Sequence, residues 1–215
     1  MHGNKNEKKK DFFTLVVVAI IIFLLLAGLA SADKYMTENI VQIITDTGRG
    51  SGFLFANGVV LTARHVLEDA NDVMIIYEDK KSEESNRILR DPRYDIALIK
   101  VKRRCPDLIR FSSYTPKLGE TLYMHGYPYD FGLMRLSKGI SASKRYDAPE
   151  RYYKENGWNK FFLGDFTSSP GNSGSPVFNE KREVVGMLVA GYENLHIVLD
   201  AHIVYVFVRA NGYKN

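Results

Sequence analysis

Short apolar runs rich in β-branched and aromatic residues recur along most of this chain, separated by turn-forming or charged residues. They cover residues 39–45, 52–55, 59–63, 73–77, 95–101, 121–126, 133–141, 160–166, 175–178, 184–191 and 196–200. Runs of this length and composition are typical of strands, and so many of them favour an all-β barrel or sandwich. One helix is expected, over residues 201–210, where Ile203, Val204, Phe207 and Val208 form one apolar stripe.

The turn signals between these runs refine the prediction. Asn57-Gly58 lies between two apolar runs and predicts a type I′ hairpin, since both central positions of that turn take positive φ. The charged segments 78–86 and 143–159 are predicted to be loops. With 215 residues, of which 45% are hydrophobic, one folded domain is expected.

The N-terminal segment is directed to a membrane. Residues 12–32 are 21 uncharged residues that follow Lys8–Lys10, close to the ~20 that a transmembrane helix needs, with the basic side in the cytoplasm. The segment ends in Ala30-Ser31-Ala32, which also fits signal-peptidase cleavage. We expect a basic cytoplasmic tail over residues 1–11, an anchor or signal peptide over residues 12–32, and a membrane-anchored or secreted extracytoplasmic domain over residues 33–215. A buried core helix is the third interpretation, although this segment lacks a polar face.

Charge, cysteine and ligand patterns argue against several function classes. Residues 33–215 carry 25 basic and 23 acidic side chains without a basic patch, so binding to nucleic acid is not expected. The single Cys105 has no partner for an intrachain disulfide, and we interpret it as a loop cysteine rather than a thiol nucleophile. No His, Cys or acidic cluster has metal-ligand spacing, so neither a metal nor a cofactor is expected. We expect a monomer.

Three motifs with reactive side chains follow one another in the chain: TARHV with His65, YDIALIKV with Asp95, and PGNSGSP with Ser173. A serine hydroxyl becomes nucleophilic when an imidazole takes its proton and a carboxylate holds that imidazole in one tautomer. We therefore predict His65 as general base, Asp95 as its orienting carboxylate and Ser173 as nucleophile. Gly171 and Gly174 flank the serine and allow close approach of a substrate. The backbone N–H groups of Gly171 and Ser173 are predicted to form an oxyanion hole.

These motifs, with HGYPYDFGLMRLSKGIS at 125–141 and GNSGSPVFNEKREVVGM at 171–187, resemble the trypsin-like serine peptidases of chymotrypsin fold. Within that group the chain is most similar to the V8-like glutamyl endopeptidases and more loosely to HtrA-type proteases. The resemblance implies two six-stranded antiparallel β-barrels with the site between them. It also implies endopeptidase activity on protein or peptide substrates through an acyl-enzyme. The alternative is a catalytically inactive protease fold that binds a partner at the membrane surface.

The resemblance also implies where the substrate side chain before the scissile bond (P1) is held. The predicted S1 pocket consists of uncharged residues, namely Thr167, Ser168, Val189 and Gly191. Such a pocket disfavours Lys or Arg at P1, which needs a buried carboxylate. The histidine that binds the substrate carboxylate in glutamyl endopeptidases is replaced here by Leu188. His196 is either a substitute for it, if its ring reaches the pocket, or a hydrogen-bonded strand residue.

Overall fold

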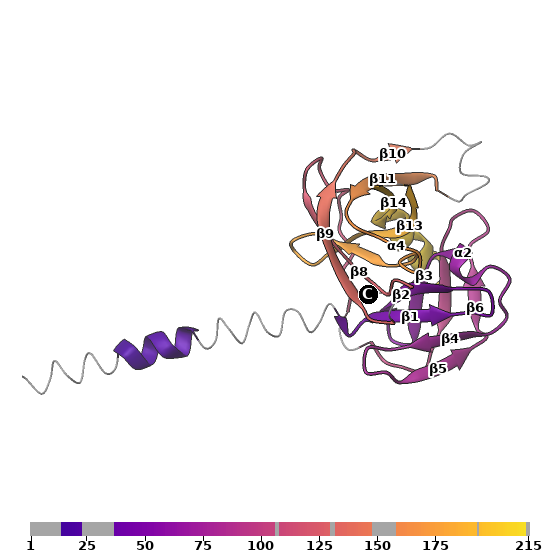
Figure 1. The fold of residues 1–215 in the computed structure, drawn as a ribbon, viewed down its shortest axis with the longest axis horizontal. Coiled ribbons are helices and arrows are strands. Elements are labelled where there is room, and N and C mark those ends of the chain that lie inside the picture. The colour runs from indigo at the N-terminus through magenta and orange to yellow at the C-terminus, as the bar shows by residue number, and fades with distance from the viewer. Residues whose placement is uncertain are drawn as a thin grey trace, which may run out of the picture. The chain divides into compact units, whose positions relative to one another are not determined.

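The computed structural model describes residues 14–22, 37–105, 108–129, 132–147, 158–192 and 194–213. It separates into two units, residues 1–36 and 37–215. In the first unit, residues 14–22 are helical and exposed (Figure 1). No helix in the described ranges is long and apolar enough to cross a membrane. The predicted basic tail and both ends of the 12–32 segment lie outside the described residues.

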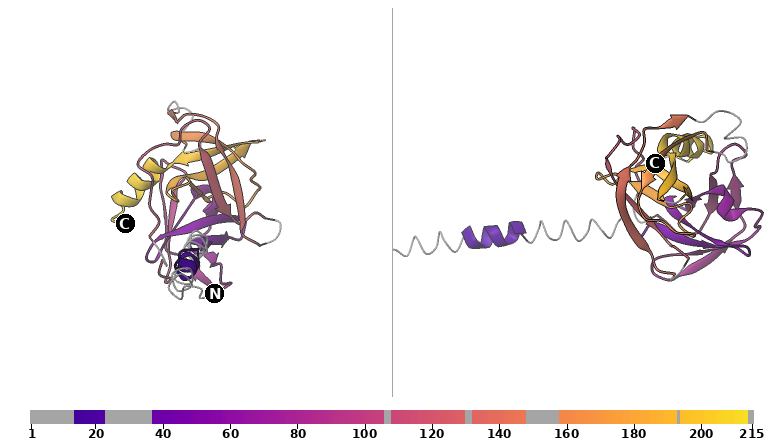
Figure 2. Two further views of the ribbon diagram at one scale, coloured as in Figure 1. Left: turned by 90° about the vertical axis from the view of Figure 1, so that its left-hand side faces the viewer. Right: turned by 45° about the horizontal axis from the view of Figure 1, so that its top comes forward.

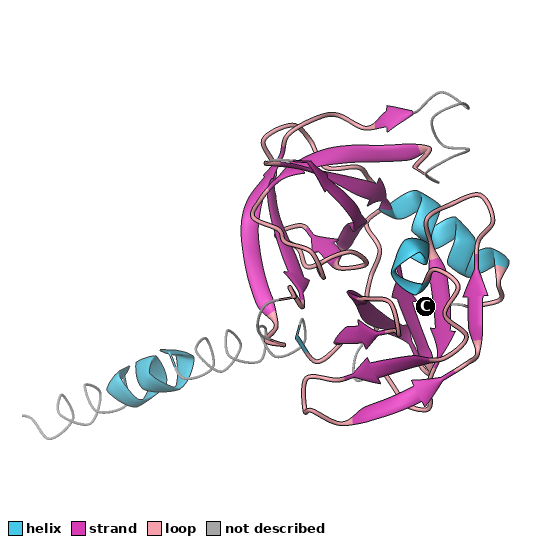
Figure 3. Cartoon of the chain, turned by 45° about the vertical axis from the view of Figure 1, so that its right-hand side comes forward, coloured by secondary structure: helices cyan, strands magenta, loops and turns pink. Residues whose placement is uncertain are grey.

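The second unit is built mainly from two antiparallel sheets (Figures 1 and 3). The first contains β1 (Ile40–Ile44), β2 (Arg49–Ala56), β3 (Val59–Thr62), β4 (Val73–Ile76), β5 (Ser82–Ser85), β6 (Ile88–Arg90) and β7 (Ala97–Lys100). The second contains β8 (Thr121–Gly126), β9 (Arg135–Ser141), β10 (Tyr146–Asp147), β11 (Lys160–Asp165), β12 (Pro176–Phe178), β13 (Val184–Tyr192) and β14 (Leu195–Asp200). Helix α2 (Arg64–Leu67) follows β3, and α4 (Ala201–Ala210) follows β14. In the views of Figures 1 and 2 the two sheets form separate halves of this unit.

The two sheets close to different degrees. The second runs β10-β11-β14-β13-β12-β8-β9, and β11 also pairs with β9, so six strands form a closed ring with β10 outside it. The first runs β5-β4-β1-β2-β3-β7-β6, and its edge strands do not pair with each other. The predicted chymotrypsin-like fold is therefore confirmed. The six strands expected per barrel are found in the closed ring, whereas the first barrel-like sheet has seven among the described residues.

Buried apolar side chains form the core of both barrel-like sheets, and β2 and β3 of the first sheet are buried almost throughout. The core of the second barrel consists of Leu122, Met124, Phe162, Phe166, Val177, Val185, Leu188 and Val198. Fully burying one such side chain stabilises the fold by about 1.5–3 kcal/mol. Helix α4 packs on β13 and β14 (Figure 3). Its predicted stripe is buried as expected, and the Asp200 carboxylate caps the helix by accepting from the His202 N–H at 2.8 Å.

Two local predictions are wrong. The hairpin between β2 and β3 is not of type I′, because of its two central residues only Gly58 has a positive φ, of 73°. A register shift between Leu54 and Ala56 marks a β-bulge there, and a bulge increases strand twist without a second positive φ. The segments 78–86 and 143–159, predicted to be loops, contain β5 and the two-residue β10. Strand β5 reads SEES, and a polar sequence of this kind suits an edge strand, where charge discourages pairing with other chains.

Candidate active site

The first barrel positions both His65 and Asp95. Strand β3 leads through extended Ala63 into α2, the single helical turn that carries His65. Asp95 lies at the end of the turn before β7, and the Asp91 carboxylate holds that turn by accepting from the N–H groups of Arg93 and Tyr94 at 2.7 and 3.0 Å. The two segments are adjacent in space because β3 and β7 are paired neighbours, with Thr62 opposite Ala97.

Asp95 holds His65 with both carboxylate oxygens. Oδ1 accepts from the backbone N–H of His65 at 2.9 Å, and Oδ2 lies 2.7 Å from its ring Nδ1. Asp95 is 2% exposed, whereas the His65 side chain is 45% exposed, so the imidazole is held on its inner side and open on its outer side. Burial raises the pKa of Asp95, but the hydrogen bonds and charge of His65 outweigh burial and the pKa lies below its usual value. The carboxylate is therefore ionised at neutral pH.

A third donor to Asp95 comes from the second barrel. Trp158, two residues before β11, places its indole Nε1 3.1 Å from Asp95 Oδ2. Sequence reasoning missed this contact. The residues are 63 positions apart, and no local motif around Trp158 indicates a role.

Ser173 lies in a turn that only glycines can build. Gly171 and Gly174 have φ values of 96° and 88°. A Cβ on Gly174 would lie 2.1 Å from the Ser51 carbonyl oxygen, and one on Gly171 would lie 2.7 Å from the Tyr127 carbonyl oxygen. The Ser173 turn therefore packs directly against the backbone of Ser51 on one side and of Tyr127 on the other.

Ser51, on β2, connects this turn to the first barrel. Its N–H donates to the Ser173 carbonyl at 2.8 Å, and its fully buried hydroxyl donates to the Gly171 carbonyl at 2.8 Å. The same hydroxyl accepts from the Tyr127 N–H at 2.8 Å. Because Thr62 donates to the Ser51 carbonyl at 2.7 Å, the serine turn lies beside the strand that leads to His65. Among the described hydrogen bonds, none joins the Ser173 hydroxyl to the His65 ring.

Two amides of the serine turn point to no acceptor. The N–H groups of Asn172, Gly174 and Ser175 donate to backbone carbonyls at 3.1, 2.8 and 3.0 Å. Those of Gly171 and Ser173, the pair predicted for the oxyanion hole, make no hydrogen bond within the described part of the chain. They remain able to donate to a developing negative oxygen.

A pocket of about 230 Å³ adjoins Ser173. Its lining residues are Ser168, Ser169, Pro170, Ser173, Leu188, Ala190, Gly191 and His196. Ser168 and Gly191, two of the four residues predicted for S1, are among these lining residues. Thr167 is exposed and Val189 is buried, and neither is among the lining residues. Among the described residues, no carboxylate and no Lys or Arg side chain lines the pocket.

His196, on β14, is one of the lining residues of this pocket. Its Nδ1 lies 3.1 Å from the Ser168 hydroxyl, and its ring stacks on Phe166 at 5.2 Å between centroids. Burial lowers the pKa of His196, and neither its hydrogen bond to the Phe166 backbone nor the negative Asp165 fully restores that pKa. The imidazole is thus neutral at neutral pH, and the lining residues that the structure describes then carry no positive charge.

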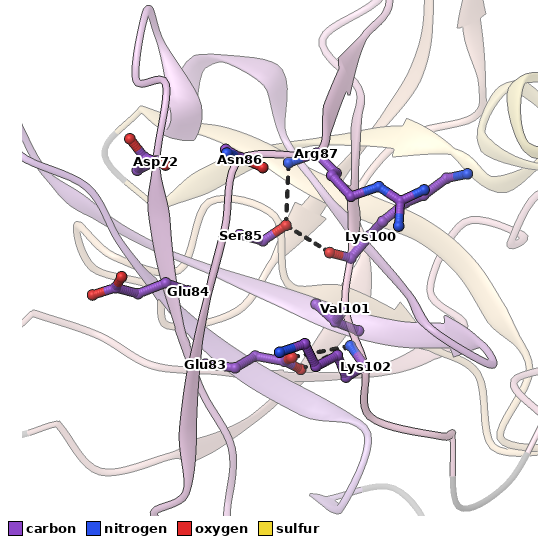
Figure 4. A pocket seen from close by; sticks show the side chains of 9 residues that line it. All are labelled: Asp72, Glu83, Glu84, Ser85, Asn86, Arg87, Lys100, Val101 and Lys102. Atoms are coloured by element: carbon purple, nitrogen blue, oxygen red, sulfur yellow. Dashed lines mark hydrogen bonds between the residues drawn. The ribbon is translucent and has the colours of Figure 1, made fainter.

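A second hollow, of about 330 Å³, lies on the first sheet (Figure 4). Its polar groups serve the fold: the Ser85 hydroxyl donates to the Lys100 carbonyl at 2.6 Å, and the Glu83 carboxylate accepts from the Lys102 N–H at 3.0 Å. These bonds connect β5 to the end of β7, where no strand ladder closes the sheet. Within the described ranges, no group of three or more His, Cys, Asp or Glu residues could hold a metal ion.

The chain is similar to known proteases in sequence. The family model described as "Trypsin-like peptidase domain" matches residues 50–187. The chain is 37% identical over 140 residues to a probable periplasmic serine endoprotease DegP-like of Ectopseudomonas mendocina (strain ymp), and 35% identical over 140 residues to a protein of the same description from Pseudomonas putida (strain GB-1). Each alignment covers 64% of this chain but only 28% of the relative.

Solved structures share the fold. The active form of the Rv3671c protease from M. tuberculosis has a TM-score of 0.71 at 22% identity, covering 84% of this chain and 83% of that one. The HtrA-type protease AlgW with tripeptide has a TM-score of 0.73 at 19% identity, covering 84% of this chain and 62% of that one. Of these proteins, AlgW is described as an HtrA-type protease, the group that the sequence resembles more loosely.

Proposed function

Because the chain belongs to the trypsin-like peptidase domain family, we propose that it is a serine endopeptidase with His65, Asp95 and Ser173 as its catalytic triad. The observation that carries the proposal is the pair of hydrogen bonds by which buried Asp95 holds His65. This pair lies beside a serine turn in which the amides of Gly171 and Ser173 have no acceptor among the described residues. A buried carboxylate, a half-exposed imidazole and free amides are the parts that acyl transfer requires.

The proposed reaction follows from these positions. Asp95 accepts the Nδ1–H of His65, which leaves Nε2 without a proton and able to take the proton of the Ser173 hydroxyl. The serine oxygen attacks the substrate carbonyl carbon, and the amides of Gly171 and Ser173 stabilise the resulting oxyanion. When the intermediate collapses, His65 gives its proton to the leaving amine and the acyl group stays on Ser173. Water, deprotonated by the same imidazole, then releases the acid product.

The pocket beside Ser173 is the proposed S1 site. The part of its lining that the structure describes contains no carboxylate to pair with a P1 Lys or Arg, so a basic P1 residue is disfavoured. Leu188 occupies the place of the carboxylate-binding histidine of glutamyl endopeptidases, and it lines the pocket. We propose uncharged P1 side chains of moderate size, with Ser168 and His196 as hydrogen-bonding partners.

The proposed substrates are proteins or peptides outside the cytoplasm, and the proposed enzyme acts as a monomer. The DegP-like relatives are described as periplasmic, and residues 12–32 of this chain are an uncharged run after three lysines. We propose that this segment exports the domain of residues 33–215, either as an anchor or as a signal peptide. The mass of the mature protein distinguishes the two, since cleavage after Ala32 removes 32 residues.

Triad substitutions in the purified full chain test the proposal. Ser173→Ala or His65→Ala is expected to lower kcat for casein by about 10⁶-fold, and Asp95→Asn by about 10⁴-fold. The losses are expected to be non-additive, because the three side chains act as one unit. If Ser173→Ala hydrolyses casein as fast as the wild type, the assignment is wrong. If the wild type itself is inert, the inactive binding module becomes the better account.

A further inference from the structure

The Asp95 carboxylate is held from both barrels. The first barrel supplies two donors, the backbone N–H and the ring Nδ1 of His65. The second supplies one, the indole N–H of Trp158, which lies 3.1 Å from the oxygen that also contacts the ring. Oδ2 therefore has two donors and Oδ1 has one.

The indole contact is well suited to fix the direction of the carboxylate. A carboxylate that is 2% exposed has little water to satisfy its lone pairs, so each protein donor matters more than at the surface. The indole side chain of Trp158 has one N–H donor and no acceptor. That N–H donates to Asp95 Oδ2. Without it, Oδ2 keeps only the His65 ring donor, and one of the three hydrogen bonds that fix the orientation of the carboxylate is lost.

We propose that Trp158 is a positioning residue of this site, whose indole N–H holds Asp95 Oδ2 in the orientation that receives the Nδ1–H of His65. The inference rests on the proposed function, because it assigns Trp158 a role in the same triad. Trp158 itself touches no reacting atom in this account and acts through Asp95. Since Trp158 precedes β11 and Asp95 precedes β7, the contact also makes the triad depend on how the two barrels dock.

The chain contains one tryptophan, which permits a sharp experiment. Growth of a tryptophan auxotroph on β-(3-benzothienyl)alanine replaces the N–H of this one indole by sulfur and keeps the shape of the ring. Trp158→Phe is the second variant. Tyr146→Phe is the matched control, since Tyr146 is an exposed aromatic residue on β10 that packs against Phe161.

Three readouts are taken on the full chain: kcat and KM for a peptide substrate, fluorophosphonate labelling, and the far-downfield proton resonance of the His65–Asp95 hydrogen bond. Loss of the N–H is expected to lower kcat about tenfold, to leave KM within about twofold, and to shift the resonance. Tyr146→Phe is expected to change none of the three.

The outcomes separate the two proposals. If the isostere keeps both kcat and the resonance of the wild type, the positioning role of Trp158 is overturned while the peptidase proposal stands. If kcat falls but the resonance does not move, Trp158 acts only through packing and the inference is again overturned. If the wild type is neither labelled nor active, the proposed function fails. The resonance still decides in that case whether the indole holds Asp95: a shift in the isostere supports the contact, and no shift overturns it.

Discussion

At the residue scale, the site depends on keeping one carboxylate both buried and charged. Burial alone would favour the neutral form of Asp95, and its hydrogen bonds reverse that preference. The consequence is an imidazole with a defined tautomer, since an ionised Asp95 is an acceptor only and the Nδ1 of His65 must be the donor. Sequence motifs predicted these two residues because each stands in a distinctive string. Trp158 stands in none, and only the fold brings it to Asp95.

His196 determines how the pocket responds to pH. Its pKa lies below the usual 6.5, chiefly because of burial, so it is neutral at pH ~8 and gains charge only at a pH below the usual histidine range. We expect kcat/KM to favour P1 Gln over P1 Glu at pH ~8, because a buried carboxylate without a cation is unfavourable. The Glu-to-Gln ratio should rise when the pH falls below the usual histidine pKa of ~6.5 and His196 gains its charge, as long as the substrate Glu stays ionised.

Using the ratio for two otherwise identical peptides cancels every effect of pH that the two peptides share. The matched variant is His196→Gln, which keeps a polar group near Ser168 but has no charge to gain, so its ratio should stay flat. A wild-type preference for Glu at pH ~8 would contradict this account and return His196 to the role of a carboxylate-binding residue.

At the element scale, prediction succeeded where pattern and capping agree. Helix α4 begins and ends where its apolar stripe and Asp200 indicate, and β8 matches its predicted run residue for residue. Prediction failed for β5, because its sequence SEES has no alternation of apolar and polar residues. Its strand conformation comes from backbone pairing with β4, which the side-chain pattern does not indicate. Prediction also failed for the β2–β3 turn, since a bulge in the preceding strand is not visible in the Asn-Gly pair.

The serine turn predicts a measurable difference between two glycines. Gly174→Ala adds a Cβ 2.1 Å from the Ser51 carbonyl, at a φ of 88°. Gly119→Ala is the control, since Gly119 has a φ of 81° and nothing within 4 Å of the added atom. The control should lose about 1–2 kcal/mol of unfolding free energy from backbone strain, and Gly174→Ala about 1–3 kcal/mol more from the clash. Urea unfolding followed by circular dichroism measures the loss of unfolding free energy in both variants. Equal losses would show that the serine turn does not pack closely against the Ser51 carbonyl.

At the scale of the whole molecule, the site belongs to neither barrel alone. The first barrel holds His65 and Asp95, and the second holds Ser173 and the pocket. Hydrogen bonds of Ser51 and Trp158 connect the two barrels. The sequence predicted this division through its family resemblance, because the order of the three motifs is that of a two-barrel peptidase. It did not predict the crossing contacts, which depend on how two separately folded sheets dock.

The most direct test of this account is to treat the full chain with a fluorophosphonate and to locate the adduct by mass spectrometry. Only an activated serine reacts appreciably with such a probe, since its oxygen must displace fluoride from phosphorus. The account predicts one adduct per chain, on Ser173, that is lost in Ser173→Ala and strongly slowed in His65→Ala. An unmodified wild-type chain, or an adduct that persists in Ser173→Ala, would contradict it.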